Sequence, residues 1–275
     1  VNLLTDNMGQ FIDSRHPYVT CSNEFIESEW WLIKEIDKKG LIYYGNKVLP
    51  YCPRCGTELS ANEVGQGYQE DSVNTVIVPF KIKDSDTYFL VWTTTPWTLM
   101  ANVALCVNPD LEYIKVSSMG YKFIVAKSLA NKVLGDDFEV LETYKGTDLV
   151  GTNYEQLMPF AEVEGKCFEV VADSYVTSED GTGIVHIAPA YGDDDNRVCK
   201  ENGIGFVNPV GKDGCYTTGP WEGTLVTDKD LEIEIIKWLK ENDKLFKKIK
   251  LTHDYPHCWR CHSPLIYYSK PAWYI

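Results

Sequence analysis

Two pairs of cysteines have the spacing of a metal site. Cys52 and Cys55 form one Cys-x-x-Cys motif, and Cys258 and Cys261 form a second one far along the chain. A tight turn in each motif can direct two thiolates at one ion, and four thiolates in tetrahedral geometry are the ligand set that structural zinc prefers. We therefore predict a structural zinc ion bound by Cys52, Cys55, Cys258 and Cys261.

Two alternatives to this ligand set stay open. His257 and His262 flank the second pair and either one can replace a cysteine, or the four thiols carry no metal. A thioredoxin-like redox role is disfavoured because neither pair follows a strand and opens a helix in a βαβ unit. Because no secretory signal is visible, we expect the paired cysteines to be metal ligands rather than disulfides. This also favours a reducing compartment and therefore a cytoplasmic location.

Three consecutive threonines, Thr93, Thr94 and Thr95, come at the end of an apolar, β-branched segment and are followed by Pro96. On a strand their hydroxyls project to both faces, and the proline then turns the chain. Such hydroxyls can hydrogen-bond to a carbonyl, a ribose or a positioned water. Threonine is also a common strand former, and this segment alone does not distinguish the two interpretations.

A glycine-rich turn at residues 180–183 precedes a short apolar strand that carries His186, and a cluster of three aspartates ending at Asp195 follows. A histidine on an apolar strand is either a buried core residue or a site residue. Acidic residues commonly begin helices, where they interact favourably with the helix dipole. Asp193 and Asp194 either take this helix-start role or support the side chains that contact a ligand.

Short strands and few helices surround these motifs. Apolar periodicity predicts a helix with one buried face over residues 24–39, a strand at 41–44, and a later helix that begins with Thr227 and Asp230 as a capping-box-like pair. Short β-branched and aromatic segments between residues 74 and 187 predict a barrel or closed sheet. Those segments are 75–78, 88–92, 113–116, 123–125, 168–171 and 184–187.

The two cysteine pairs enclose nearly all of the predicted strands. We expect an α/β, β-rich chain in which a β-barrel-type domain (residues 71–250) with surrounding helices is inserted into a small zinc-ribbon base. Residues 1–70 and 251–275 form that base. No apolar segment approaches the roughly 20 residues of a membrane-spanning helix, and the chain lacks an initiating Met, so we expect an excerpt of a longer polypeptide that is monomeric and not membrane-bound.

The net charge of −14 disfavours an independent nucleic-acid binder, because affinity for phosphates normally comes from a basic surface. Any contact with nucleic acid must be local or must depend on other parts of a parent protein.

Taken together, the segment Trp-Thr-Thr-Thr-Pro-Trp-Thr (92–98) and the segment Gly-Thr-Gly-Ile-Val-His-Ile-Ala-Pro-Ala-Tyr-Gly (181–192) closely resemble the editing insertion, called CP1, of isoleucyl-tRNA synthetases. The resemblance covers the whole chain, including residues 27–31 and both cysteine motifs. His-x-Gly-His and Lys-Met-Ser-Lys-Ser, the signatures of the synthetic site, are absent. Met100 departs from the proline that is common after Thr-Leu in that family, which puts the local loop shape in question.

The resemblance implies an aminoacyl-tRNA ester hydrolase that removes valine from the 3′ end of tRNA(Ile), while ATP binds only in the missing synthetic domain of the parent enzyme. It implies that Asp195 holds the α-amino group of the substrate and that Thr93, Thr94 and Thr95 position the ester and a water molecule. His186 and Trp97 would line the amino-acid pocket, and Asn102 would lie on the ribose side. Other partners would be the remainder of the synthetase.

Alternative functions stay open beside this one. A zinc-ribbon module could bind a tRNA end without catalysis, or an editing site of valyl type could act on Thr-tRNA. The valyl type is disfavoured by the Thr95-Pro96-Trp97 sequence, which lacks the arginine typical of that family. A degenerate, inactive copy is disfavoured because each matching position holds the expected residue type.

Overall fold

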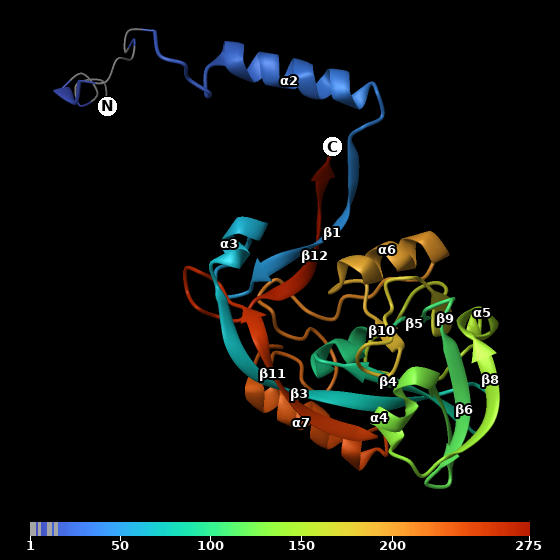
Figure 1. The fold of residues 1–275 in the computed structure, drawn as a ribbon. Coiled ribbons are helices and arrows are strands. Elements are labelled where there is room, and N and C mark those ends of the chain that lie inside the picture. The colour runs from blue at the N-terminus through green and yellow to red at the C-terminus, as the bar shows by residue number, and fades with distance from the viewer. Residues whose placement is uncertain (1–3, 5–6, 10–12, 14–15) are drawn as a thin grey trace. The chain divides into compact units, whose positions relative to one another are not determined.

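The computed structural model describes residues 4, 7–9, 13 and 16–275, and the chain separates into two compact units, Val1–Asn46 with Pro271–Ile275 and Lys47–Lys270 (Figure 1). Within the smaller unit the ring of Tyr44 packs edge-on against Trp273, with 5.3 Å between the ring centroids. The proposed boundaries at residues 70 and 250 stay a prediction.

Helix α2 (Asn23–Asp37) confirms the predicted N-terminal helix. It begins after Ser22, whose hydroxyl accepts a hydrogen bond from the Phe25 backbone N–H at 3.3 Å. The prediction that one face of this helix is buried is wrong within the described part of the chain. None of the helix residues is buried there, and Trp30 and Trp31 are 65% and 60% exposed. An apolar face is buried only when a second surface covers it, and the described part of this unit supplies none.

Six strands form the main sheet of the larger unit. Their order is β11 (Lys247–Pro256), β3 (Tyr68–Lys81), β4 (Thr87–Thr93), β7 (Tyr121–Ala126), β6 (Glu112–Ser118) and β8 (Glu139–Lys145). All neighbours are antiparallel except β4 and β7, which run parallel. The predicted strands at 75–78, 88–92, 113–116 and 123–125 lie within β3, β4, β6 and β7.

The strand-rich α/β class is therefore confirmed, but the sheet stays open, with β11 and β8 at its edges. Both edges are charged: β8 is almost entirely exposed and contains Glu139 and Glu142, and β11 contains Lys248 and Lys250. The prediction of a closed sheet is therefore wrong. Charged edge strands resist further pairing, which explains why the two edges of this sheet do not join.

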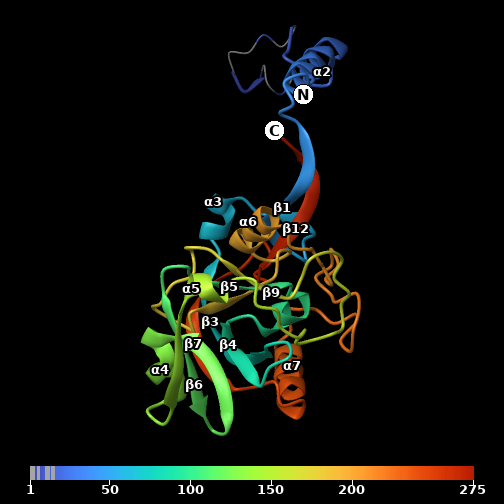
Figure 2. The ribbon, with the colours of Figure 1, turned by 90° about the vertical axis from the view of Figure 1, so that its right-hand side faces the viewer.

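A second sheet of three strands packs against the first. It consists of β10 (Ile184–Ile187), β5 (Ala104–Val107) and β9 (Glu169–Ala172) (Figure 1), of which β5 and β9 are also labelled in Figure 2. Strand β10 contacts β4 of the large sheet. One hydrophobic cluster includes Phe80 and Phe89 of the large sheet together with Leu105 and Val170 of the small one. The ends of β4 and β10, which carry the threonines and the histidine, are consequently held by the same core.

The third sheet has the order β12 (Ile266–Tyr274), β1 (Tyr43–Cys52) and β2 (Thr57–Glu58). The predicted strand at 41–44 begins two residues later and extends to the first cysteine. Short helices fill the connections between strands. These are α3 (Ala61–Gly65), η1 (Pro96–Ala101), η2 (Lys127–Leu129), α4 (Ala130–Leu134), α5 (Gly146–Leu149) and α6 (Asp193–Asn202).

Helix α7 (Lys229–Glu241) lies beside β3 and β11 (Figure 1). The spacing of Leu231, Ile235, Trp238 and Leu239 predicts one buried face, which is confirmed, since Leu231, Ile235 and Leu239 are buried and Trp238 is partly buried against the core. The predicted start is wrong: the N-cap is Asp228, whose carboxylate accepts a hydrogen bond from the Asp230 backbone N–H at 2.9 Å. Asp and Thr are both suitable N-cap residues, and the backbone entry angle decides which one caps the helix.

Candidate functional site

The four predicted metal ligands lie together. The Sγ atoms of Cys52, Cys55, Cys258 and Cys261 are all within 4.8 Å of one another, and those of Cys52 and Cys261 are 3.5 Å apart. Tetrahedral Zn–S bonds of about 2.3 Å place sulfur atoms at such separations. In the part of the chain that the structure describes, neither His257 nor His262 joins this cluster, and the His257 ring instead hydrogen-bonds to the Tyr255 carbonyl at 3.0 Å. The donor set therefore fits a tetrahedral thiolate site.

The threonine motif bridges the end of β4 and helix η1. Thr93 is the last residue of β4, and its Oγ1 accepts a hydrogen bond from the Thr95 backbone N–H at 3.2 Å. Pro96 begins η1, because its fixed φ suits the first helical position. The Oγ1 atoms of Thr93 and Thr95 lie 3.5 Å apart, and those of Thr95 and Thr98 lie 3.3 Å apart. The turn thus collects three hydroxyls into one chain.

His186 continues this hydroxyl chain from the neighbouring sheet. Its Nε2 is 2.9 Å from Thr98 Oγ1, and its Nδ1 is buried without a hydrogen-bond partner among the described residues. Burial disfavours the imidazolium form and lowers the pKa of His186 to about 4, so that the ring is neutral at pH 7. Sequence reasoning missed Thr98, although its position three residues after Thr95 places both on one side of the helical turn.

Trp97 and Asn102 have different surroundings. The Trp97 ring packs edge-on against Tyr191 at 4.7 Å, and its carbonyl accepts a hydrogen bond from the Tyr216 hydroxyl at 2.6 Å. Asn102 is buried, with its amide donating to the Ala104 carbonyl at 2.8 Å and its Oδ1 accepting from the Tyr154 hydroxyl at 2.7 Å. Asn102 thus anchors the end of η1, and its role on a ribose side stays a prediction.

Asp195 lies in the first turn of α6, which begins at Asp193 as expected. Its Oδ2 accepts a hydrogen bond from the Ala188 backbone N–H at 2.9 Å, and its Oδ1 from the Tyr175 hydroxyl at 3.4 Å. Desolvation outweighs these hydrogen bonds and raises the pKa of Asp195 to about 6. A Cβ atom on Gly192 would lie 2.6 Å from the Asp195 Cγ, so the glycine of this motif leaves room for the carboxylate.

A cleft of about 580 Å³ opens beside the threonine motif. Thr94, Thr95, Pro96 and Trp97 form one part of its lining, and the rest comes from β3, from α7 and the segment just before it, from β11 and from Pro264. His186 and Asp195 do not line it. His186 is connected to it through Thr98 and Thr95, and the Asp195 carboxylate hydrogen-bonds two residues beyond His186, at Ala188.

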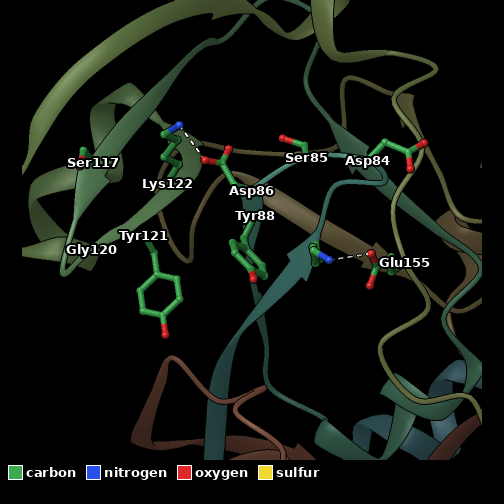
Figure 3. Close-up of a pocket in the computed structure, with 10 residues that line it drawn as sticks. Asp84, Ser85, Asp86, Tyr88, Ser117, Gly120, Tyr121, Lys122 and Glu155 are labelled. Atoms are coloured by element: carbon green, nitrogen blue, oxygen red, sulfur yellow. Dashed lines mark hydrogen bonds and ion pairs between the residues drawn. The ribbon is translucent and has the colours of Figure 1, made fainter.

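A larger pocket of about 930 Å³ contains none of the predicted site residues (Figure 3). Its two lysines are paired with carboxylates, Lys81 with Glu155 at 2.9 Å and Lys122 with Asp86 at 2.7 Å. No described helix has both the length and the apolar character needed to cross a membrane.

The chain matches a protein family and known relatives along nearly its whole length. A family model for class I tRNA synthetases (I, L, M and V) matches residues 3–275. The chain is similar to the isoleucine–tRNA ligases of Clostridium tetani (45% identity) and Clostridium novyi (47%), in each case over 275 residues. These matches cover 99% of this chain but 26% of each relative, so the chain spans about a quarter of their length.

Solved structures show the same fold at low sequence identity. The editing domain of the P. knowlesi cytosolic leucyl-tRNA synthetase has a TM-score of 0.52 and 13% identity, covering 66% of this chain and 98% of that one. The crystal structure of GlLeuRS-CP1 also has a TM-score of 0.52, with 15% identity and coverage of 63% and 98%. At such identities the likeness establishes the fold alone.

Proposed function

Since the chain belongs to the class I tRNA synthetases (I, L, M and V), we propose that it is the editing part of an isoleucyl enzyme, where it hydrolyses the ester linking valine to the 3′ end of tRNA(Ile). Isoleucine–tRNA ligases as relatives and leucyl editing domains as structural neighbours support this proposal. The observation that carries it is the hydroxyl chain from Thr95 through Thr98 to His186, which ends at a cleft.

Enzymes of this family are the standard example of the limited selectivity that a binding pocket has between two amino acids of similar size. Isoleucine and valine differ by one methylene, and a binding pocket converts that difference into only about 1–3 kcal/mol. A second site that admits the smaller amino acid and hydrolyses its ester corrects the remaining errors.

In the proposed reaction a bound water attacks the ester carbonyl, its oxygen forms the new acyl bond, and the ribose oxygen leaves with a proton. Thr93, Thr94 and Thr95 position the ester and the water. Neutral His186 fixes the orientation of the Thr98 hydroxyl and, through it, that of Thr95. No described serine or cysteine is hydrogen-bonded to a histidine, and we therefore assign direct attack by water rather than a covalent intermediate.

Asp195 holds the protonated α-amino group of the amino acid through a charge-assisted hydrogen bond. This requires the carboxylate form. Because the pKa of Asp195 is raised to about 6, the protonated, neutral form predominates below that pH, and hydrolysis should increase as the pH rises through 6. Trp97, which lines the cleft, forms the wall that excludes isoleucine, and His186 supports that wall from behind through Thr98 and Thr95. Buried Asn102 supports the ribose side indirectly, by anchoring the end of η1.

Zinc is the metal that we propose for the four cysteines, where it would connect residues 52–55 with residues 258–261 and take no part in hydrolysis. The other partners that we propose are tRNA(Ile) and the remainder of a longer synthetase, which would carry the ATP site. A cytoplasmic location and a monomeric fragment also remain proposals.

Deacylation of Val-tRNA(Ile) and Ile-tRNA(Ile) tests the function directly, with Asp195→Asn beside Asp193→Asn as the matched control on the same helix turn. We expect hydrolysis of the valyl ester only. Asp195→Asn should lower the rate roughly 10- to 100-fold, because a hydrogen bond to a charged group contributes about 1.5–3 kcal/mol. Asp193 is exposed, and its substitution should leave the rate within about twofold.

Equal hydrolysis of both esters would exclude an isoleucyl editing site. Binding of tRNA by the chain without any hydrolysis, in the presence of its parent enzyme's remaining parts, would identify a binding module instead.

A further inference from the structure

The cleft beside the threonine motif has a second wall that the proposed reaction does not use. This wall is formed by β11, β3 and the first turns of α7. Lys248 and Lys250 of β11 line it, and so do Asp71, Asp228, Lys229 and Glu232. The arrangement of these charges indicates what the cleft can bind.

The carboxylates of this wall already have hydrogen-bond donors. Asp71 forms an ion pair with Lys229 at 2.9 Å, and Asp228 caps α7. Glu232 accepts hydrogen bonds from the backbone N–H of Asn74, at 3.1 Å, and from its side-chain amide. The contacts of Asp71 with Lys229 and of Glu232 with Asn74 join β3 to the start of α7, and Asp228 is used in capping that helix.

Two of the three lysines of β11, in contrast, line this cleft and have no partner among the described residues. Lys248 and Lys250 are exposed and form no ion pair or side-chain hydrogen bond within the described residues. They are separated by one residue of a strand, so both project from the same face, roughly 7 Å apart. The lysines of the pocket in Figure 3 are each neutralised by a carboxylate, whereas Lys248 and Lys250 leave two adjacent positive charges available in their cleft.

Apolar surface lies beside these cations. Ile233 of α7 is 58% exposed and lines the cleft with Trp97 and Pro96. Two adjacent cations next to exposed apolar surface match the chemistry of a single-stranded nucleic acid, which presents phosphates on one side and the faces of its bases on the other.

We propose that Lys248 and Lys250 bind two neighbouring phosphates of the single-stranded RNA 3′ end that enters this cleft. The contact guides the terminal ribose toward Thr94 and Thr95 on the opposite wall. This inference rests on the proposed function, which supplies the ester at that 3′ end. It also explains how a strongly acidic chain binds RNA through a local contact.

The first test is binding of a short, 5′-fluorescein-labelled single-stranded RNA that ends in CCA, measured by fluorescence anisotropy over a series of salt concentrations. In the Lys248→Gln/Lys250→Gln variant, binding at low salt should weaken about tenfold. Each phosphate contact contributes about 0.7 to the slope of log K against log salt for single strands, so that the slope should fall by about 1.4. This measurement requires no hydrolysis.

The control is Lys83→Gln/Lys212→Gln, which removes the same charge from exposed lysines outside the cleft. Its affinity should stay within about twofold of the unaltered chain, and the melting temperatures of both variants should be unchanged because surface lysines contribute little to stability. An equal loss of affinity in both variants, or unchanged affinity in Lys248→Gln/Lys250→Gln, would overturn the proposal.

Deacylation separates this inference from the proposed function. If Lys248 and Lys250 only hold the RNA, the variant should show a KM raised about tenfold with kcat unchanged. Loss of kcat at unchanged KM would overturn the inference while leaving the editing function intact. RNA binding that depends on the two lysines in a chain that hydrolyses no ester would support the phosphate site and refute the editing function.

Discussion

The pKa values of His186 and Asp195 shift in opposite directions, although both side chains lie near the same end of β10, His186 buried and Asp195 half-buried. Burial favours the neutral form of each side chain. For the histidine this means a lowered pKa and for the aspartate a raised pKa. At pH 7 the site therefore contains an uncharged imidazole and a carboxylate that is ionised but poorly solvated. Because the imidazole adds no positive charge, the carboxylate is suited to bind one cationic ligand group.

The pH dependence of stability should reveal both preferences. The folded pKa of His186, about 4, lies below its ordinary 6.5, so the unfolded chain binds the extra proton and stability falls as the pH drops from 6.5 to 4. As the pH drops over that interval, the free energy of unfolding of His186→Gln should rise by roughly 2–3 kcal/mol relative to that of the unaltered chain. The folded pKa of Asp195, about 6, lies above 3.8, so Asp195→Asn should gain relative stability as the pH rises from 4 to 7.

Urea unfolding of the three proteins at pH 4.5, 5.5, 6.5 and 7.5 measures these differences. Asp193→Asn serves as the control and should show a flat difference, because that side chain is exposed. Two variants whose differences changed with pH in the same direction would contradict the assignment of opposite shifts.

At the scale of elements, the position of His186 depends on how β10 meets β7. Gly183 directly precedes β10 and has a φ of +72°, and a Cβ there would lie 2.4 Å from the Ala126 Cβ at the end of β7. The Ala126 backbone N–H also donates to the Thr182 carbonyl at 3.0 Å. The glycine is required both for the turn and for this close approach.

Gly183→Ala should therefore destabilise the chain by about 2–4 kcal/mol, because left-handed backbone strain and overpacking both contribute. Gly120→Ala is the matched control. Gly120 has a φ of +81° but open space around a Cβ, so its substitution should cost only about 1 kcal/mol. Chemical denaturation of both variants measures the difference, and equal losses would show that close packing at Gly183 contributes nothing.

At the scale of the whole molecule, the cysteine cluster joins two segments that enclose both sheets of the larger unit. Cys52 ends β1, Cys258 follows β11, and both are completely buried in a small cluster with Leu59, Val64 and Leu265. That cluster is separate from the main core. With so little apolar area to bury, a metal ion is expected to supply most of the stability of this region.

Metal removal should therefore lower stability markedly. We expect one zinc per chain, and we expect chelation or Cys55→Ser to cost roughly 3–5 kcal/mol, by analogy with a crosslink that closes a long loop. For a chain of this size that corresponds to a melting temperature lower by about 6–15 °C. Cys215→Ser, which alters a cysteine outside the cluster, is the control and should change neither metal content nor melting temperature. A chain that melts identically with and without chelator would contradict a structural metal.

Local patterns in the sequence determined which segments became strands and helices. Short segments rich in β-branched and aromatic residues predicted β4 and β10, and the spacing of Leu231, Ile235, Trp238 and Leu239 predicted the buried face of α7. The motif residues and the four cysteines were also recognisable as side chains able to do chemistry. These properties depend on residue type and short-range spacing, which are present in the sequence itself.

Only the tertiary structure decided which of these side chains meet. Thr98 contacts His186 across a sequence separation of 88, and Asn102 is used inside the core rather than at the cleft. The open edges of the large sheet, the exposed face of α2 and the unpaired Lys248 and Lys250 likewise depend on what packs against each element. Such contacts are set by the packing of distant segments, whose free energy no short stretch of sequence contains.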